Sequence, residues 1–531
     1  MVNYIRHTVY IKRRVHKFLR GFAESQRGAV AVIVAVVLPI LVGVTFGAVD
    51  FSRAMSSRQV LQDGLDAATL FAARSTAVTD AELQAIGSKA MTANMLNLHD
   101  GALVSVSFVS GDSGQKVIGV AQGVVPTSVL GLVGIGALDL TARTEVMRSS
   151  KNLEVALVLD TTGSMRGQNI IDMKAAAADL IDIVVRDAQT PFYSKVALVP
   201  YSLAVNVGPY AVQARGAIAG EKTITGATRA NPVVITAAGH GFANGDKVYI
   251  SGVKGMTQLN GKLFTVANRT TNSFQLQNVN GWYYNYYSSG GSVSCTTQGC
   301  PYYSFSSPYG NDNTFAVSSC VSERTGSNAY TEAAPSTALL GRNYPSPDNP
   351  CLQNTITPLS SDKAALKASL NVLEAEGSTG GHIGIAWGWY MLSPNFGYLW
   401  PGASAGAAYT APDLIKAVVI MTDGEYNSVY CNGVISRNST TGSGSIRDHE
   451  SCDAPNGSSY YQSGQICSRM RAAGVIVYVV GFKVVNTQNA ATLIANCATD
   501  STHVYYPETG TDLKTAFRSI GQDLSRLRIY R

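Results

Sequence analysis

One uncharged run of 22 residues limits what this chain can fold into: GAVAVIVAVVLPILVGVTFGAV, at 28–49. A helix rises about 1.5 Å per residue, so this run would be about 33 Å long and would cross the hydrocarbon core of a bilayer. Pro39 is tolerated there, because neighbouring groups can replace one lost backbone hydrogen bond. The alternatives are a buried core helix and a cleaved signal peptide, whose apolar region is normally shorter. We expect a single transmembrane helix.

The net positive charge of the chain lies in the tail before this run. Residues 1–27 carry seven Lys or Arg and one acid, a net charge of 7 − 1 = +6, which equals the formal charge of the whole chain. Residues 28–531 therefore sum to zero, with no overall basic surplus for a nucleic-acid groove, and we expect no nucleic-acid partner. By the positive-inside rule, the tail lies in the cytoplasm and residues 50–531 lie on the other side of the membrane.

Cysteine usage agrees with that orientation. All eight cysteines follow the apolar run, and an even number in an oxidising compartment predicts disulfides. A zinc site is the alternative, but the sequence contains no CxxC pair and no Cys/His cluster with ligand spacing. Pairing in sequence order is the simplest of the possible connectivities, which the sequence leaves open. The candidates are Cys295, Cys300, Cys320, Cys351, Cys431, Cys452, Cys467 and Cys497.

Changes of pattern along the chain predict several separate folding units. Apolar residues at helical spacing after the membrane run indicate a helical stalk, and one helix with three strands indicates a small α+β unit after it. The expected division is a basic tail at 1–27, the transmembrane helix at 28–49, the stalk at 50–75, the α+β unit at 76–150, an α/β domain at 151–221 and 361–531, an inserted β-barrel at 222–294 and a Tyr-rich, disulfide-tied excursion at 295–360.

The α/β domain is expected to have a doubly wound, mostly parallel sheet. Apolar runs such as LEVALVLD and LIKAVVIMT alternate with helical segments, and they lack the polar alternation of a half-exposed strand. Parallel strands covered by helices on both faces have this composition. Between the two halves of the domain, short strands alternate with turns such as NGD and NGK, which is typical of a small β-barrel.

Side-chain oxygens gather where two predicted strands of the α/β domain end. Asp160, Thr162 and Ser164 follow the first strand in DTTGS, Asp423 follows a second in MTDG, and Thr379 lies in the loop GSTGG before a helix. Ligands bind at the carboxyl ends of the strands in such sheets. Two carboxylates and three hydroxyls are the hard donors that Mg²⁺, Mn²⁺ and Ca²⁺ prefer. The alternative is that these residues only cap the following helix and close a turn.

The same residues carry a family resemblance. DTTGS, the threonine of GSTGG and the aspartate of TDG match the metal-ion-dependent adhesion site of von Willebrand factor A domains, with a threonine where many members have serine. The resemblance implies that Asp160, Thr162, Ser164, Thr379 and Asp423 hold a divalent cation, with Mg²⁺ favoured over Ca²⁺ or Mn²⁺. It also implies an open coordination position for an acidic group on a protein partner.

Two further resemblances concern other parts of the chain. RGAVAVIVAVVLPILVGVTFGAVDFSRAM, followed by LQDGLDAATLFAAR, resembles the start of TadG-like Flp pilus assembly proteins, and the ending LKTAFRSIGQDLSRLRI is similar too. This implies a single-pass protein of the bacterial inner membrane, with most of the chain periplasmic or extracellular, that assembles or anchors tight-adherence pili with other envelope components. The insert resembles the small barrel domain, FCCH, of ubiquitin-activating enzymes, and is expected to be a scaffold or contact module.

The sequence offers little support for an enzyme. Hydrolysis at a bound metal needs a general base, and the two histidines considered for that role are His382, just after Thr379, and His240, in the insert. Both are expected to be structural, and no GxSxG elbow or Walker loop occurs. We therefore expect a binding module. A surface adhesin using the same metal site is the alternative to pilus assembly, and a metal-dependent hydrolase is a third possibility.

Overall fold

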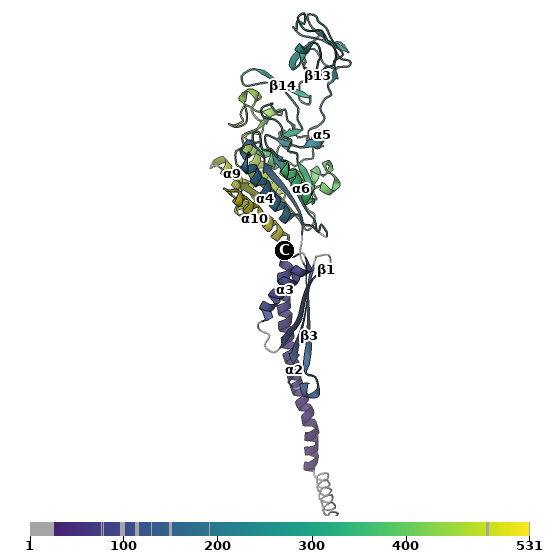
Figure 1. Ribbon diagram of the computed structural model, residues 1–531, viewed down its shortest axis with the longest axis vertical. Helices are drawn as coiled ribbons and strands as arrows, with labels where there is room; N and C mark the ends of the chain where they lie inside the picture. Colours follow the sequence, from purple (N-terminus) through teal and green to yellow (C-terminus); the bar gives the residue numbers. More distant parts are fainter. Residues whose placement is uncertain are drawn as a thin grey trace, which may run out of the picture. The chain divides into compact units, whose positions relative to one another are not determined.

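The computed structural model describes residues 26–529 apart from 76, 78, 96–100, 112–115, 129, 148–150, 191 and 485–487. The chain divides into two compact units, at residues 1–149 and 150–531 (Figure 1). Most of the predicted cytoplasmic tail, residues 1–25, lies outside the described residues.

The first unit is built on one long helix. Helix α2 (Gln26–Arg74) joins the predicted membrane helix and stalk without a break, and Pro39 lies within it. It is the one helix in the described residues that is long and apolar enough to cross a membrane, and its most apolar window has no buried side chain. Side chains such as Ile33 and Leu41 are more than half exposed, which suits contact with lipid rather than with a protein core.

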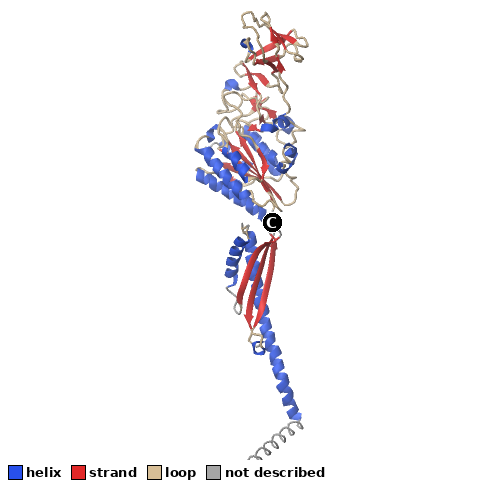
Figure 2. Cartoon of the chain, turned by 45° about the vertical axis from the view of Figure 1, so that its right-hand side comes forward, coloured by secondary structure: helices blue, strands red, loops and turns tan. Residues whose placement is uncertain are grey.

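A three-stranded sheet covers the second half of that helix. Strands β1 (Ala102–Gly111), β2 (Lys116–Pro126) and β3 (Ala137–Met147) form an antiparallel sheet, and helix α3 (Asp80–Asn94) completes the unit (Figure 2). Its core consists of side chains such as Leu65, Leu83 and Phe108. Asp50 holds the loop after β2 against α2, since its carboxylate accepts hydrogen bonds from the backbone of Ser128 and Leu130.

The second unit is a mixed α/β unit around a six-stranded sheet. The strands are β4 (Asn152–Asp160), β5 (Ser194–Tyr201), β18 (Thr357–Ser360), β19 (Leu414–Thr422), β22 (Ile476–Gly481) and β23 (Val504–Tyr505). Their order is β18-β5-β4-β19-β22-β23. All neighbours are parallel except β18, which pairs antiparallel with β5 at one edge. The sequence pattern did not indicate β18 or β23, which are short.

Helices cover both faces of this sheet. Alternate residues of β4 enter two separate cores, Val155 and Leu157 in one and Ala156 and Val158 in the other. Helices α4 (Gln168–Val184), α6 (Lys363–Asn371) and α10 (Gly510–Ile529) cover the first core, and α7 (Gly381–Leu392), α8 (Ser459–Ala472) and α9 (Gln488–Cys497) cover the second. Burial on both faces explains why the strands lack polar alternation.

The insert has a core and a sheet of its own. Its sheet has the order β7 (Lys222–Thr223), β13 (Ser292–Cys295), β10 (Lys247–Ser251), β11 (Lys262–Ala267), β12 (Ser273–Leu276), β9 (Val234–Thr236) and β8 (Gly226–Ala227). The end strands β7 and β8 are two residues apart in the chain, so the sheet curls until its edges nearly meet. The segment 222–227 bonds to both edges of this sheet, since the Ile224 N–H donates to the Gly291 carbonyl and the Thr225 N–H donates to the Thr236 carbonyl, each at 2.9 Å. The sheet therefore closes on itself as a small barrel, which extends to Cys295.

The remaining short elements lie between the insert and the α/β sheet. They are helix α5 (Ala211–Arg215), the hairpin β14 (Tyr302–Ser306) and β15 (Asp312–Ala316), the sheet of β6 (Val205–Asn206), β16 (Cys320–Ser322) and β17 (Gly341–Arg342), and the hairpin β20 (Tyr430–Cys431) and β21 (Val434–Ile435). Four disulfides pair the cysteines in sequence order: Cys295–Cys300, Cys320–Cys351, Cys431–Cys452 and Cys467–Cys497.

We predict that the insert can be removed without unfolding the α/β unit. The chain leaves for the insert and returns at adjacent points, because the Ala219 N–H donates a 2.8 Å hydrogen bond to the Gly299 carbonyl. A variant in which a short Gly/Ser linker replaces residues 220–298, with Cys300→Ser to remove the unpaired thiol, should keep a cooperative thermal transition within a few degrees of the parent. Loss of that transition in calorimetry would show that the insert is part of the α/β core.

Candidate metal centre

The predicted site lies where the chain changes direction across the sheet. Among the parallel strands, β4 comes first in the chain, β5 lies on one side of it and β19 on the other. The segment after β4 leads to α4 on one face, whereas α8, the next helix after β19, lies on the opposite face. Because the chain leaves these two neighbouring strands toward opposite faces of the sheet, a crevice opens between their ends. Sheets of this kind bind ligands in such a crevice. Asp160 and Asp423 lie at these two ends.

Asp160 organises the loop that follows β4. Its Oδ1 accepts hydrogen bonds from the backbone N–H of Thr162 at 3.0 Å and from the Thr162 hydroxyl at 2.6 Å. The Thr162 hydroxyl in turn lies 3.0 Å from the Ser164 hydroxyl. The three oxygen-bearing residues of DTTGS therefore form one connected group, with Asp160 and Thr162 buried.

Two residues that the sequence did not single out hold the other carboxylate oxygen. Asp160 Oδ2 accepts hydrogen bonds from the Tyr201 hydroxyl at 2.9 Å and from Thr422 Oγ1 at 3.2 Å. Tyr201 is the last residue of β5 and Thr422 the last of β19, so both neighbouring strands fix the carboxylate of β4. A polar residue at the end of an apolar strand was the only available signal for either one.

The GSTGG loop lies directly against the DTTGS loop. The Gly377 carbonyl accepts a hydrogen bond from the Gly163 N–H at 2.9 Å, and the Glu376 N–H donates to the Thr161 carbonyl at 3.0 Å. Thr379 is buried, and its N–H donates to Asn427 Oδ1 at 2.8 Å. These bonds bring Thr379 to the same edge of the sheet as Asp160 and leave its backbone fixed.

Asp423 completes the group as a half-buried carboxylate with one buried, unsatisfied oxygen. Its Oδ1 has no hydrogen-bond partner in the described part of the chain. Burial raises the pKa of Asp423, and the Ser164 hydroxyl beside it opposes that shift in part. Burial, followed by repulsion from Asp423, raises the pKa of Asp160 to about 7. The two carboxylates therefore destabilise each other's charge.

The opposite ends of the same two strands show how this protein compensates a buried acid with a base. Near the start of β4 and β19, Glu154 and Lys416 are both buried, and the Lys416 Nζ lies 2.5 Å from Glu154 Oε2. Within the residues that the structure describes, no Lys, Arg or His forms an ion pair with Asp160 or Asp423. Two carboxylates, of which Asp423 has an unpartnered oxygen, and three hydroxyls fit a hard divalent cation. Such an ion would supply the missing positive charge.

Neither histidine considered as a general base has a free nitrogen. His382 is fully buried, with Nε2 3.0 Å from Glu323 Oε2 and Nδ1 2.6 Å from the Ser459 hydroxyl. In the insert, His240 Nδ1 accepts the Phe242 N–H, and its Nε2 lies 2.9 Å from the Thr270 carbonyl. Both side chains tie chain segments together, and neither is placed to take a proton from a substrate.

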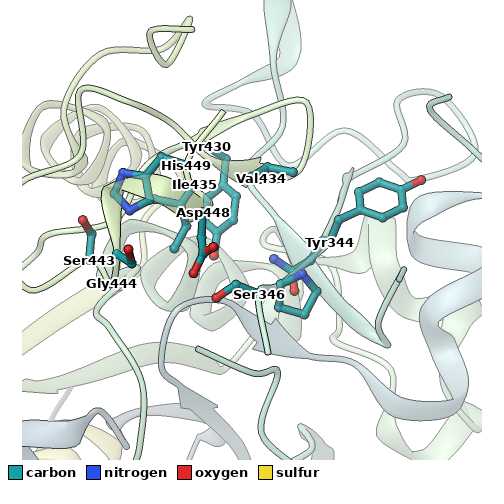
Figure 3. A pocket seen from close by; sticks show the side chains of 12 residues that line it. Tyr344, Ser346, Tyr430, Val434, Ile435, Ser443, Gly444, Asp448 and His449 are labelled. Carbon is teal, nitrogen blue, oxygen red and sulfur yellow. The ribbon is translucent and has the colours of Figure 1, made fainter. Parts of the chain in front are cut away.

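A separate small pocket contains a third buried histidine (Figure 3). His449 and Asp448 line it together with Tyr430 and Ser346. Among the described residues, neither His449 nitrogen has a hydrogen-bond partner of normal geometry. Burial lowers the pKa of His449, although the Ser443 backbone and Asp448 oppose that shift in part. The nearby group of Cys431, Glu450 and Cys452 has both sulfur atoms in a disulfide, so it offers no thiolate to a metal.

Comparison with known proteins supports the interpretation of two segments. Residues 28–75 match the family model of putative Flp pilus-assembly TadE/G-like proteins, and residues 230–296 match that of the FCCH domain of ubiquitin-activating enzyme E1. No curated protein matched the chain in a sequence search. The two matched segments cover less than half of the chain, so they identify parts of it and not a family for the whole.

Several similar solved structures come from pilus proteins. The von Willebrand domain of the type V pili tip protein Mfa5 from Porphyromonas gingivalis is 10% identical, with 72% of this chain and 97% of that chain covered and a TM-score of 0.32. The minor pilin PilB from Streptococcus sanguinis is 11% identical, with 81% and 79% covered and a TM-score of 0.30. The pilus adhesin SpaC from Lactobacillus rhamnosus GG is 10% identical, with 80% of this chain and 34% of that chain covered and a TM-score of 0.31. TM-scores below 0.5 do not establish a shared fold.

We predict that Asp423→Asn stabilises the metal-free protein. Both carboxyl pKa values are raised, so the folded state holds a proton more tightly than the unfolded state does. Stability is then lost as the pH rises from the unfolded pKa through about 7. In EDTA at pH 8 the variant should therefore melt several degrees above the parent, and at pH 5 the difference should shrink. Thermal melts monitored by circular dichroism measure this.

Asp187→Asn is the matched control. Asp187 lies at the opposite edge of the sheet, its side chain is 93% exposed, and its ion pair with Lys363 lowers its pKa. This variant should melt at or slightly below the temperature of the parent. If Asp423→Asn instead melts lower at pH 8, Asp423 serves only to close a turn.

Proposed function

We propose that this protein is a membrane-anchored, extracytoplasmic component of tight-adherence (Flp) pilus assembly that binds a protein partner through a divalent cation. Its α/β unit is a doubly wound sheet of the von Willebrand A type, and the cation, Mg²⁺ before Ca²⁺ or Mn²⁺, is held by Asp160, Thr162, Ser164, Thr379 and Asp423. An acidic side chain of the partner takes the coordination position that these residues leave open.

The observation that carries the metal proposal is the pair of acids, with Asp160 buried and Asp423 half-buried. Asp160 and Asp423 lie at adjacent strand ends, and Asp423 keeps one buried oxygen without a partner. Burying a charge that has no counter-charge costs on the order of several kcal/mol, unless a cation or a proton neutralises that charge. The same strands neutralise Glu154 with Lys416, so an ion is the simplest counterpart at the other end.

Each residue has a distinct part in the proposed site. Asp160 is held by hydrogen bonds from Thr162, Tyr201 and Thr422, so its position is fixed before an ion arrives. The hydroxyls of Thr162, Ser164 and Thr379 offer neutral oxygens. Because only two of the five donors carry charge, the bound ion would keep a strong attraction for a carboxylate from outside the chain.

Membrane anchoring rests on the first helix. Helix α2 is apolar over a length that spans a bilayer, and the segment around it matches the TadE/G-like model. The four disulfides lie in the second unit, which suits an oxidising compartment outside the cytoplasm, and the basic tail suits the cytoplasmic side. We therefore place the protein in the bacterial inner membrane with its bulk periplasmic or extracellular.

The metal site can be tested by titration. In isothermal titration calorimetry of the detergent-solubilised full chain, Mg²⁺ should bind with one site per chain. Asp423→Asn should weaken that binding at least about 100-fold, because it removes a negative charge from the site. Thr379→Val should weaken it about tenfold, because it removes a neutral oxygen donor. Asp187→Asn should bind Mg²⁺ as the parent does. Unchanged Mg²⁺ affinity in Asp423→Asn, with the variant folded, would refute the site.

Assembly and surface adhesion differ in where the protein works. Pull-down from envelope extracts with the full chain should recover pilus components in Mg²⁺ and lose them in EDTA, because the ion bridges the two proteins. The same loss should occur in Mg²⁺ with Asp423→Asn as bait. Digestion of the second unit by protease added to whole cells would favour the adhesin, whereas protection until the outer layers are opened would favour assembly.

A further inference from the structure

One end of the insert carries exposed aromatic rings that no other described part of the second unit covers. Three loops meet there, 228–233, 252–261 and 277–291, and we call this surface the aromatic end. Trp282 is 58% exposed, Tyr283 is 90% exposed and Tyr286 is 73% exposed, and they are the only large apolar side chains exposed on the insert. The neighbouring rings of Tyr284 and Tyr287 pack against the insert's core instead. The exposed rings at the aromatic end therefore do not contribute to the core of the insert.

Hydrogen bonds between the three loops fix the rings in place. Arg229 Nε donates to the Trp282 carbonyl at 2.8 Å, and the Arg229 guanidinium lies 4.7 Å from the centre of the Tyr286 ring. The backbone of Lys254 pairs with Ser288 and Ser289. Gly255 has a φ of +80°, and a Cβ there would lie 2.1 Å from the Tyr286 carbonyl. Such close packing preorganises the loop and lowers the entropy lost when a ligand binds.

The aromatic end is also basic, which the neutral sum over 28–531 concealed. Residues 222–295 contain six Lys or Arg and one acid, a net charge of 6 − 1 = +5. The single acid, Asp246, lies at the opposite end of the insert, in the turn before β10. Arg229, Lys254 and Lys262 lie at or next to the aromatic end, are exposed, and have no acidic partner among the described residues. The neutral total therefore does not exclude a local anion-binding surface.

The aromatic end points away from the attachment of the insert. Strand β7 enters the insert and β13 leaves it, and the two pair antiparallel, Thr223 with Ser292 and Lys222 with Val293. Both chain crossings therefore lie at the opposite end, where Cys295 is tied to Cys300. A ligand can approach the rings without displacing the rest of the second unit.

We propose that the aromatic end binds an acidic polysaccharide. Flat Trp and Tyr faces pack against the C–H faces of sugar rings, and the uncompensated cations attract the carboxylates or other anionic groups of the polymer. Exposed Asn285 and Ser288 add hydrogen-bonding groups for hydroxyls. No large aliphatic side chain is exposed on the described insert, so the surface offers a ligand aromatic faces, cations and polar groups. This choice rests on the proposed function, because the location outside the cytoplasm, which the disulfide at the base of the insert suits, favours a polysaccharide over single-stranded nucleic acid.

The test is binding of the detergent-solubilised full chain to three probes in EDTA: polygalacturonate, neutral dextran and a single-stranded oligothymidylate. EDTA removes the proposed metal site from the measurement, so failure here and failure of the metal site are distinguishable. Polygalacturonate should bind more tightly than dextran, and its affinity should fall with salt, because part of the attraction is electrostatic. The double variant Trp282→Ser/Tyr286→Ser should lose at least about tenfold in affinity.

Matched variants separate the aromatic end from general charge and aromaticity. Lys254→Gln/Lys262→Gln should weaken polygalacturonate binding, whereas Arg269→Gln, at the opposite end of the insert, and Tyr309→Ser, an exposed ring outside it, should not. Equal loss in the control variants would overturn the proposal, as would binding of dextran as tight as that of polygalacturonate. Tighter binding of the oligothymidylate would replace the polysaccharide with single-stranded nucleic acid, which uses the same stacking and charge.

Discussion

The second unit depends on how it accommodates two acids that end adjacent strands. Asp160 and Asp423 are brought together by the parallel pairing of β4 with β19, and that pairing also buries the cores on both faces of the sheet. The strands cannot part to relieve the repulsion without exposing those cores. The surrounding chain fixes the acids instead: Tyr201 and Thr422 hold one carboxylate, and the loop at 376–379 lies against the other side of the site. The site is thus rigid before any ligand binds.

Much of this arrangement could be predicted from the sequence because the information is local. DTTGS and MTDG directly follow apolar runs, so the strand ends and the acids on them are visible together. Tyr201 and Thr422 could not be found in this way, since their hydrogen bonds to Asp160 depend on the register between strands. Tyr201 lies 41 positions from Asp160 in the chain, and Thr422 lies 262 positions from it. The short strands β18 and β23 were missed because two to four residues are too few to show periodicity. The start of helix α8 at Ser459 is also hard to predict, because its first turn is polar and is capped by the Ser458 side chain.

The long interruption of the α/β unit is possible because its ends meet. The hydrogen bond between Ala219 and Gly299 closes the base of the insert, so the sheet on either side is joined as if by a short loop. The excursion that follows lacks a large core, and the Cys320–Cys351 disulfide limits its freedom instead. Cross-links of this kind stabilise mainly by restricting the unfolded chain, which suits loop-rich segments with few apolar side chains.

Charge illustrates why composition and structure have to be combined. A sum of zero over residues 28–531 is compatible with an even mixture or with opposite charges kept apart, and the two have different binding properties. The structure shows the second case within the insert, since Asp246 lies at one end while Arg229, Lys254 and Lys262 lie at or near the other. At the carboxyl ends of β4 and β19, by contrast, like charges lie together, since Asp160 and Asp423 meet there without a base among the described residues. The proposed anion-binding surface and the proposed cation site can therefore coexist within residues 28–531, whose charges sum to zero, and ligands for the two need not compete.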